Sequence, residues 1–122
     1  MKKRILITYF KNGDMKNEVA KKLMHDAITR DFFLDGKEMV SESKTNDVTK
    51  TIFTDGSVIE VVPCGATLIG RRYTHIYTDA TTISLGYDAM LKTLITQSKE
   101  YAFGKELNVY DVENGKLNIE KY

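Results

Sequence analysis

Two adjacent arginines are the residues of this sequence best suited to hold a charged ligand. Arg71 and Arg72 stand at the end of a loop, directly before a β-rich run. Paired guanidinium groups can fork onto a phosphate or a carboxylate. A solvated loop pair, or one arginine used in an ion pair within the fold, would need no ligand. The pair is therefore a candidate binding site with these two alternatives open.

The run after the arginines alternates aromatic with β-branched residues. Tyr73, His75 and Tyr77 are spaced by two, which predicts that they share one face of a strand. Aromatic side chains beside arginines can stack a base or a nucleotide. The same pattern is also typical of a core or an interface. These three residues join the arginines as candidate ligand-binding residues.

Asp79 ends the same strand and completes the candidate set. Ligands of α/β proteins bind at the carboxyl ends of strands, although an aspartate there also serves as a helix or turn cap. No catalytic residue, metal site or cofactor is predicted. His25 and His75 lack a metal-ligand partner at suitable spacing, and Cys64 has no histidine and acid around it in the sequence.

Several short elements must position these residues. The Asp55-Gly56-Ser57 turn joins β-rich runs at 52–54 and 58–62, which predicts a hairpin. A continuous apolar run at 5–10 indicates a strand buried on both faces. From Met15 to about Arg30 the apolar residues have helical spacing and predict an amphipathic helix that buries Val19, Ala20, Leu23, Met24, Ala27 and Ile28.

The remaining segments complete the expected order. Residues 32–34 either end the first helix or form a short strand, and the polar stretch 41–50 predicts a mobile surface loop. A second helix is expected from an N-cap at Ser84 to a stop at Gly104, followed by a terminal hairpin at about 106–120. This order predicts an α/β or α+β fold. It would have a mixed, partly parallel sheet, two main helices and antiparallel hairpins.

Composition limits the classes of protein. The chain has 122 residues, 29% of them charged and 42% hydrophobic, which predicts one globular domain over 1–122. A net charge of +1 argues against a wholly basic coat for duplex DNA. One cysteine excludes an intrachain disulfide. No apolar run suits a membrane span or a signal peptide, so we expect a cytoplasmic protein without a membrane partner.

The central stretch also resembles a known family. The turn Asp55-Gly56-Ser57, the pair Gly70-Arg71 and the strand ending in Asp79 are similar to the pre-Walker-B and Walker-B region of phage terminase large subunits and related helicase-type P-loop ATPases. The segment 5–24 is placed like their Walker A unit, so the resemblance covers roughly the first two-thirds of the chain.

The family's catalytic residues are incomplete here. The loop before the first helix has one glycine, Gly13, followed by Asp14, and Asn17 stands where the family has serine or threonine. Ala80 stands where the family has the glutamate that activates water. The resemblance therefore implies either an inactive relative or convergence of a hairpin and a strand.

Three functions remain open from the sequence. The favoured one is a small non-enzymatic binding protein, a phage-type accessory or inhibitory factor in the host cell cytoplasm. It would recognise a protein, nucleotide or nucleic-acid partner through its basic loop. An enzyme would need Asp79 and Asp88 to hold Mg²⁺ while Arg71 clamps a phosphate. A structural subunit would pair the edge of its terminal hairpin between chains. A homodimer is a further expectation for the partner.

Overall fold

The computed structural model describes residues 3–11, 15–45, 48–96, 105–111 and 116–121. Seven strands form one mixed sheet in the order β2-β3-β4-β1-β5-β6-β7. The central strands β4, β1, β5 and β6 are parallel, and hairpins add β3 and β2 at one side and β7 at the other. The strands are β1 (Arg4–Tyr9), β2 (Met39–Thr45), β3 (Val48–Phe53), β4 (Val58–Pro63), β5 (His75–Asp79), β6 (Glu106–Asp111) and β7 (Lys116–Lys121). The predicted mixed sheet is confirmed.

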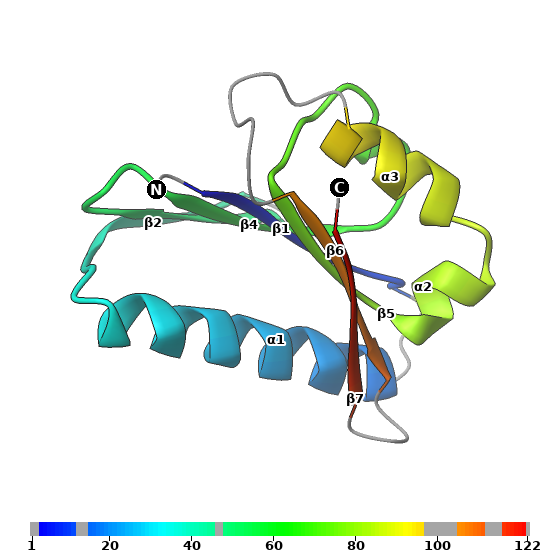
Figure 1. Cartoon of the computed structure of the whole chain (residues 1–122), viewed down its shortest axis with the longest axis horizontal. Coiled ribbons are helices and arrows are strands. Elements are labelled where there is room, and N and C mark those ends of the chain that lie inside the picture. The colour runs from blue at the N-terminus through cyan, green and yellow to red at the C-terminus, as the bar shows by residue number, and fades with distance from the viewer. Residues whose placement is uncertain (1–2, 12–14, 46–47, 97–104, 112–115, 122) are drawn as a thin grey trace.

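Helices cover the two faces of the sheet unequally. The long helix α1 (Met15–Leu34) packs on one face, over β1 and β5. On the opposite face lie the short 3-10 turn η1 (Ala66–Leu68) and the helices α2 (Ala80–Ser84) and α3 (Asp88–Thr96), as Figure 1 shows. The two faces have separate apolar clusters, with Ile5 and Ile7 under α1 and Leu6 and Ile76 under α3. Within the described part of the chain, no helix combines the length and the apolar character needed to cross a bilayer.

Helix α1 is longer than its predicted end near Arg30. Its last turn closes when Gly36, at φ +78°, donates to the carbonyl of Phe33 and Lys37 donates to that of Phe32. This is the hydrogen-bond pattern of a glycine C-cap, so residues 32–34 end the helix rather than form a strand. The buried stripe is spaced by four residues and consists of Ala20, Met24, Ile28 and Phe32. Val19 and Leu23, which were predicted to be buried, are each 45% exposed on the flanks of this stripe.

The expected surface loop at 41–50 is wrong. Its described residues, 41–45 and 48–50, belong to β2 and β3, which pair antiparallel from Met39↔Phe53 to Thr45↔Val48. Every residue of β2 is exposed, because the strand lies at the edge of the sheet and none of the described helices covers it. Backbone hydrogen bonds between the strands therefore order this segment. The prediction of a loop was wrong because it required alternating hydrophobic residues as the sign of a strand, and this segment has none.

The predicted second helix is also different. Asp79 caps α2, which ends at Ser84, and the chain turns at Gly86 with φ +90° before α3 begins at Asp88. Gly86 adopts this left-handed conformation without strain. Ser84 is therefore the last residue of α2 rather than an N-cap, and the expected helix begins only at Asp88. Its predicted stop at Gly104 lies outside the described residues.

Candidate functional site

Glu60 is a buried carboxylate in the middle of the sheet. It is 3% exposed on β4 and lies beside Leu6, so it points to the α3 face. A buried charge is costly unless other groups pair with it and hydrogen-bond to it. Arg4, Arg71 and Tyr73 supply those contacts, and together with Glu60 they form the Glu60 network.

The predicted ligand contact Arg71 is used inside this network. Its Nη1 donates to Glu60 Oε2 at 2.8 Å, and its Nε donates to the carbonyl of Thr67 at 3.0 Å. The Tyr73 hydroxyl donates to the same carboxylate oxygen at 2.9 Å, and Arg4 Nη2 donates to Oε1 at 3.2 Å. Burial lowers the pKa of Arg71, but Tyr73 and Glu60 raise it above its usual value. The structure thus has the ion pair that the sequence left open as an alternative.

The guanidinium group of Arg72 does not point to the same contact as that of Arg71. Its Nη1 donates to the backbone carbonyl of Arg71 at 2.8 Å, and its side chain is half-buried. The two guanidinium groups therefore serve different contacts rather than one shared anion site. A phosphate at Arg71 would have to compete with the buried Glu60.

The expected aromatic face is wrong, because Tyr73 and the other two residues lie on opposite faces of the sheet. Tyr73 precedes β5, and its fully buried ring packs in the α3-side cluster. His75 and Tyr77 lie towards α1, where both line a small hollow with Asp31. His75 is 5% exposed and its Nδ1 lies 2.7 Å from the Thr74 hydroxyl. The period-two pattern failed because the strand begins two residues later than expected.

Asp79 is the N-cap of α2 and lies at the carboxyl end of β5. Its Oδ1 accepts from the backbone N–H of Thr82 at 2.7 Å, while its Oδ2 is buried with no partner among the described residues. Nearby, burial and, to a smaller extent, the charge of Asp79 raise the pKa of the Cys64 thiol. Asp79 is 1% exposed and Thr8 is fully buried, so neither side chain is accessible to a ligand.

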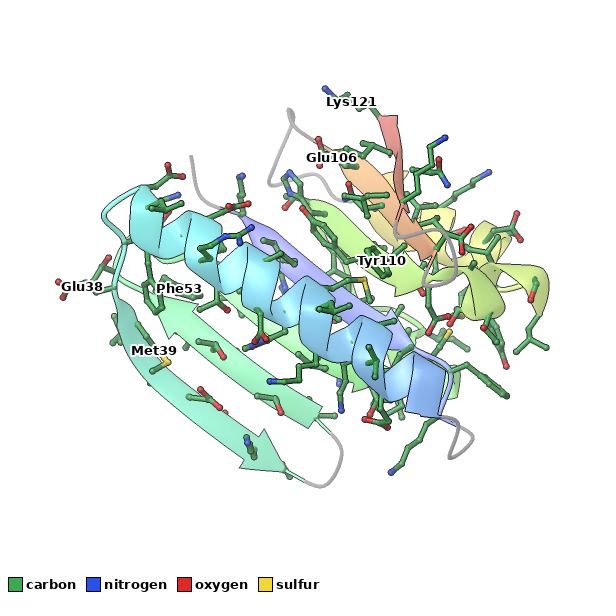
Figure 2. The ribbon with its side chains drawn as sticks, turned by 90° about the horizontal axis from the view of Figure 1, so that it is seen from below. Glu38, Met39, Phe53, Glu106, Tyr110 and Lys121 are labelled. Atoms are coloured by element: carbon green, nitrogen blue, oxygen red, sulfur yellow. The ribbon has the colours of Figure 1, made fainter. Side chains whose placement is uncertain are left out.

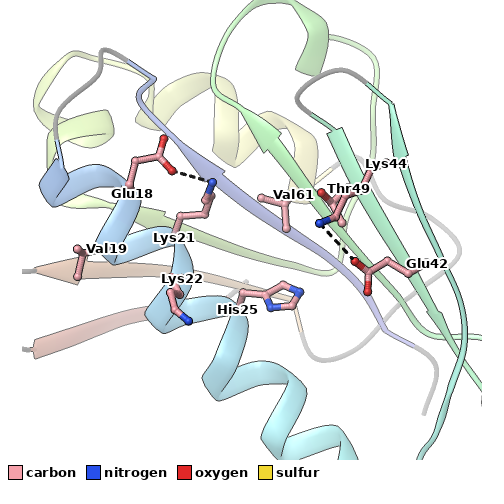
Figure 3. A pocket seen from close by; sticks show the side chains of 9 residues that line it. All are labelled: Glu18, Val19, Lys21, Lys22, His25, Glu42, Lys44, Thr49 and Val61. Atoms are coloured by element: carbon pink, nitrogen blue, oxygen red, sulfur yellow. Dashed lines mark ion pairs between the residues drawn. The ribbon is translucent and has the colours of Figure 1, made fainter.

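An open hollow lies elsewhere, between α1 and the β2–β3–β4 side of the sheet. We call it the α1–β3 groove; its volume is about 450 Å³, within the size range of small-molecule sites. Figure 3 shows charged side chains entering it from both the helix and the sheet. The charged and titratable residues that line it are Glu18, Lys21, Lys22, His25, Glu42 and Lys44.

Positive charge exceeds negative charge in this groove. Three lysines face two glutamates, which leaves a lining charge of +1 with His25 neutral. Lys21 is held by Glu18 at 2.8 Å, and although burial lowers its pKa, Glu18 and Tyr9 raise it. Lys22 and Lys44 have looser partners, Asp26 at 3.6 Å and Glu42 at 4.0 Å.

The floor of the groove offers an uncharged polar group. Thr49 and Val61 line it from neighbouring positions on β3 and β4. Thr51 lies two residues further along the same face of β3, opposite Glu42, and its buried hydroxyl has no hydrogen-bond partner within the described ranges. Thr49 therefore supplies an uncharged polar side chain at the floor, whereas the Thr51 hydroxyl is buried.

Sequence reasoning missed this groove entirely. Its residues come from separate segments of the chain, and the segment that carries Glu42, Lys44 and Thr49 was predicted to be a mobile loop. In the part of the chain that the structure describes, no three histidine, cysteine, aspartate or glutamate residues gather as metal ligands.

Comparison with known proteins gives no match to a family model, a curated protein or a solved structure. The geometry of the described residues therefore carries the functional argument.

Proposed function

We propose that this chain is a small non-enzymatic binding protein that holds a phosphate-bearing ligand of nucleotide size in the α1–β3 groove. The observation that carries the proposal is the convergence of three lysines on one open hollow of about 450 Å³. Lysine ammonium groups are strong donors to phosphate oxygens. The surplus positive charge favours an anion over a neutral ligand.

Lys22 and Lys44 are the two cations best placed to meet the phosphate. Their side chains are 76% and 73% exposed, and exposed ion pairs at 3.6–4.0 Å contribute little stability. Turning them from Asp26 and Glu42 towards a phosphate therefore costs little free energy. Arg71, in contrast, would have to leave a buried carboxylate.

The acids and the threonine hydroxyl of the groove suit the remainder of a nucleotide. Glu42 can accept from ribose hydroxyls or base amino groups once Lys44 has turned to the phosphate. Thr49 adds an uncharged polar group at the floor. A ligand with phosphate at one end and hydrogen-bond donors at the other matches this lining better than a simple anion does.

The sequence supports binding without hydrolysis. Asn17 and Ala80 replace the metal-holding and water-activating residues of the ATPases that the chain resembles. We therefore keep the phage-type accessory or inhibitory role, in the cytoplasm, as part of this proposal. The resemblance supports the role and the single cysteine fits the location.

Calorimetric titration with ATP, ADP, AMP and inorganic phosphate, at two salt concentrations, tests the proposal. The Lys22→Ala/Lys44→Ala variant should bind the preferred nucleotide at least about tenfold more weakly, since charge-assisted hydrogen bonds are worth about 1.5–3 kcal/mol each. The matched control is Lys50→Ala, which removes a lysine from β3 on the opposite face of the sheet, beside Glu60. It should bind like the wild type.

Two results would count against this function. Absence of nucleotide binding by the wild type refutes it, as does an equal loss of affinity in Lys50→Ala. An Arg71→Ala/Arg72→Ala variant should keep its nucleotide affinity while losing stability, because Arg71 pairs with Glu60. A third result would indicate a different site. If the wild type bound single-stranded DNA instead of nucleotides, in a salt-sensitive way, and the arginine variant lost this binding, the ligand would bind at the basic loop.

A further inference from the structure

Strand β7 is an open edge with an apolar side. Among the described residues it is the last strand of the sheet and pairs with β6 alone. Leu117 is 41% exposed and Ile119 is 53% exposed. An uncovered edge strand offers a row of free backbone donors and acceptors to another strand.

Leu117 and Ile119 lie on the α1 face of the sheet. Leu117 is opposite Tyr110, which packs against the α1-side cluster, and Ile119 is two residues further along the same face. Helix α1 packs on β1 and β5, so β7 extends beyond the area that it covers. Figure 2 shows β6 and β7 beside the helix, with the Glu106 and Lys121 ends of the two strands together.

We infer that two copies of this chain form a dimer by antiparallel pairing of their β7 strands about a twofold axis at Asn118. In that register Leu117 lies opposite Ile119 of the partner, and these apolar pairs repeat on both sides of the axis. Lys116 lies opposite position 120, which is a glutamate in the sequence. Each apolar position thus meets an apolar one, and Lys116 meets the glutamate at position 120.

The pleat of the strand selects this register. If the pairing shifted by one residue, the apolar side chains of one copy would lie opposite charged or polar residues of the other. The apolar side chains of the two copies would then point to opposite faces of the joined sheet. The other edge of the sheet is less suited to such pairing. Strand β2 has a register irregularity between Met39 and Ser41, and irregular edges disfavour strand addition.

Sedimentation velocity over a range of protein concentrations tests the dimer. Lys116→Glu puts a glutamate opposite the glutamate at position 120 twice per dimer, and should weaken association about tenfold. Lys116→Glu/Glu120→Lys exchanges the two charges and should restore association. Lys121→Glu is the matched control, since it reverses a lysine on the same strand that has no acid opposite it in this register, and it should leave association unchanged.

The outcomes separate clearly. Concentration-dependent dimerisation that is lost in Lys116→Glu and regained in the exchanged variant supports the β7 pairing. A wild type that stays monomeric at every concentration overturns it, and so does a dimer that tolerates both Lys116→Glu and Ile119→Asp. Lys116, Ile119 and Lys121 are exposed, and far-ultraviolet circular dichroism of each variant checks that the fold is unchanged. Nucleotide binding is measured separately, so neither proposal depends on the other.

Discussion

Replacing Tyr73 by phenylalanine isolates one hydrogen bond of the Glu60 network. The ring of Tyr73 is fully buried, and its hydroxyl donates to Glu60 Oε2 at 2.9 Å. The variant keeps the ring and removes only the oxygen, so no large cavity forms. A hydrogen bond to a charged group contributes about 1.5–3 kcal/mol. Since Arg71 still donates to the same oxygen at 2.8 Å, we expect a loss near the lower value, about 1.5 kcal/mol.

Urea denaturation measures this loss directly. With a slope of about 1–3 kcal/mol per molar urea, the unfolding midpoint should fall by about 1 M. The control is Tyr77→Phe, which removes a hydroxyl from a half-buried tyrosine on the α1 face, away from Glu60. If both variants shift the midpoint equally, the loss reflects any buried hydroxyl, and the argument for the Glu60 network fails.

Two further predictions concern pH. Burial opposes ionisation of Asp55, but hydrogen bonds from Ser57 and the charge of Lys37 hold its pKa below the usual value. Its stabilisation should therefore be complete above about pH 4 and disappear as pH falls through the lowered pKa, so the stability difference between wild type and Asp55→Asn should shrink in acid urea titrations. Burial lowers the pKa of His75 despite the opposing charge of Glu106, so its imidazole should titrate below about pH 6.5 by NMR, and folding stability should fall as the solution is acidified from that value. A titration of His75 above that pH would contradict the burial argument.

Local patterns predicted the parts of the fold that local physics decides. The 55–57 turn closes as expected, with Asp55 accepting from the Ser57 N–H at 2.8 Å, and β1 is buried between two helical layers. The terminal hairpin is present as β6 and β7. In each case a few neighbouring residues determine the structure, because a turn motif or an apolar run spans only a few positions of the chain.

The prediction failed where pairing with a distant segment decides the structure. Nothing within 41–50 alternates clearly, yet β3 is ordered by β4 on one side and β2 on the other. The α1–β3 groove depends on the same pairing, since Glu42 and Thr49 reach it only when β2 and β3 extend the sheet beyond α1. Because the groove is lined by one helix and three strands, its residues are scattered along the chain and form no continuous sequence motif that could predict it.

One signal for the role of Arg71 was present in the sequence. Glu60 interrupts the apolar run Val58–Val62, and an acid inside a buried strand needs cationic or hydrogen-bonding partners. Arg71 is eleven residues away along the chain, close enough for a loop to return it to β4. A cation that balances a buried acid is unavailable to a ligand, so the charges to consider are those left after such pairs are assigned. By that reasoning the exposed Lys22 and Lys44, rather than the conspicuous arginine pair, are the residues through which a phosphate would bind.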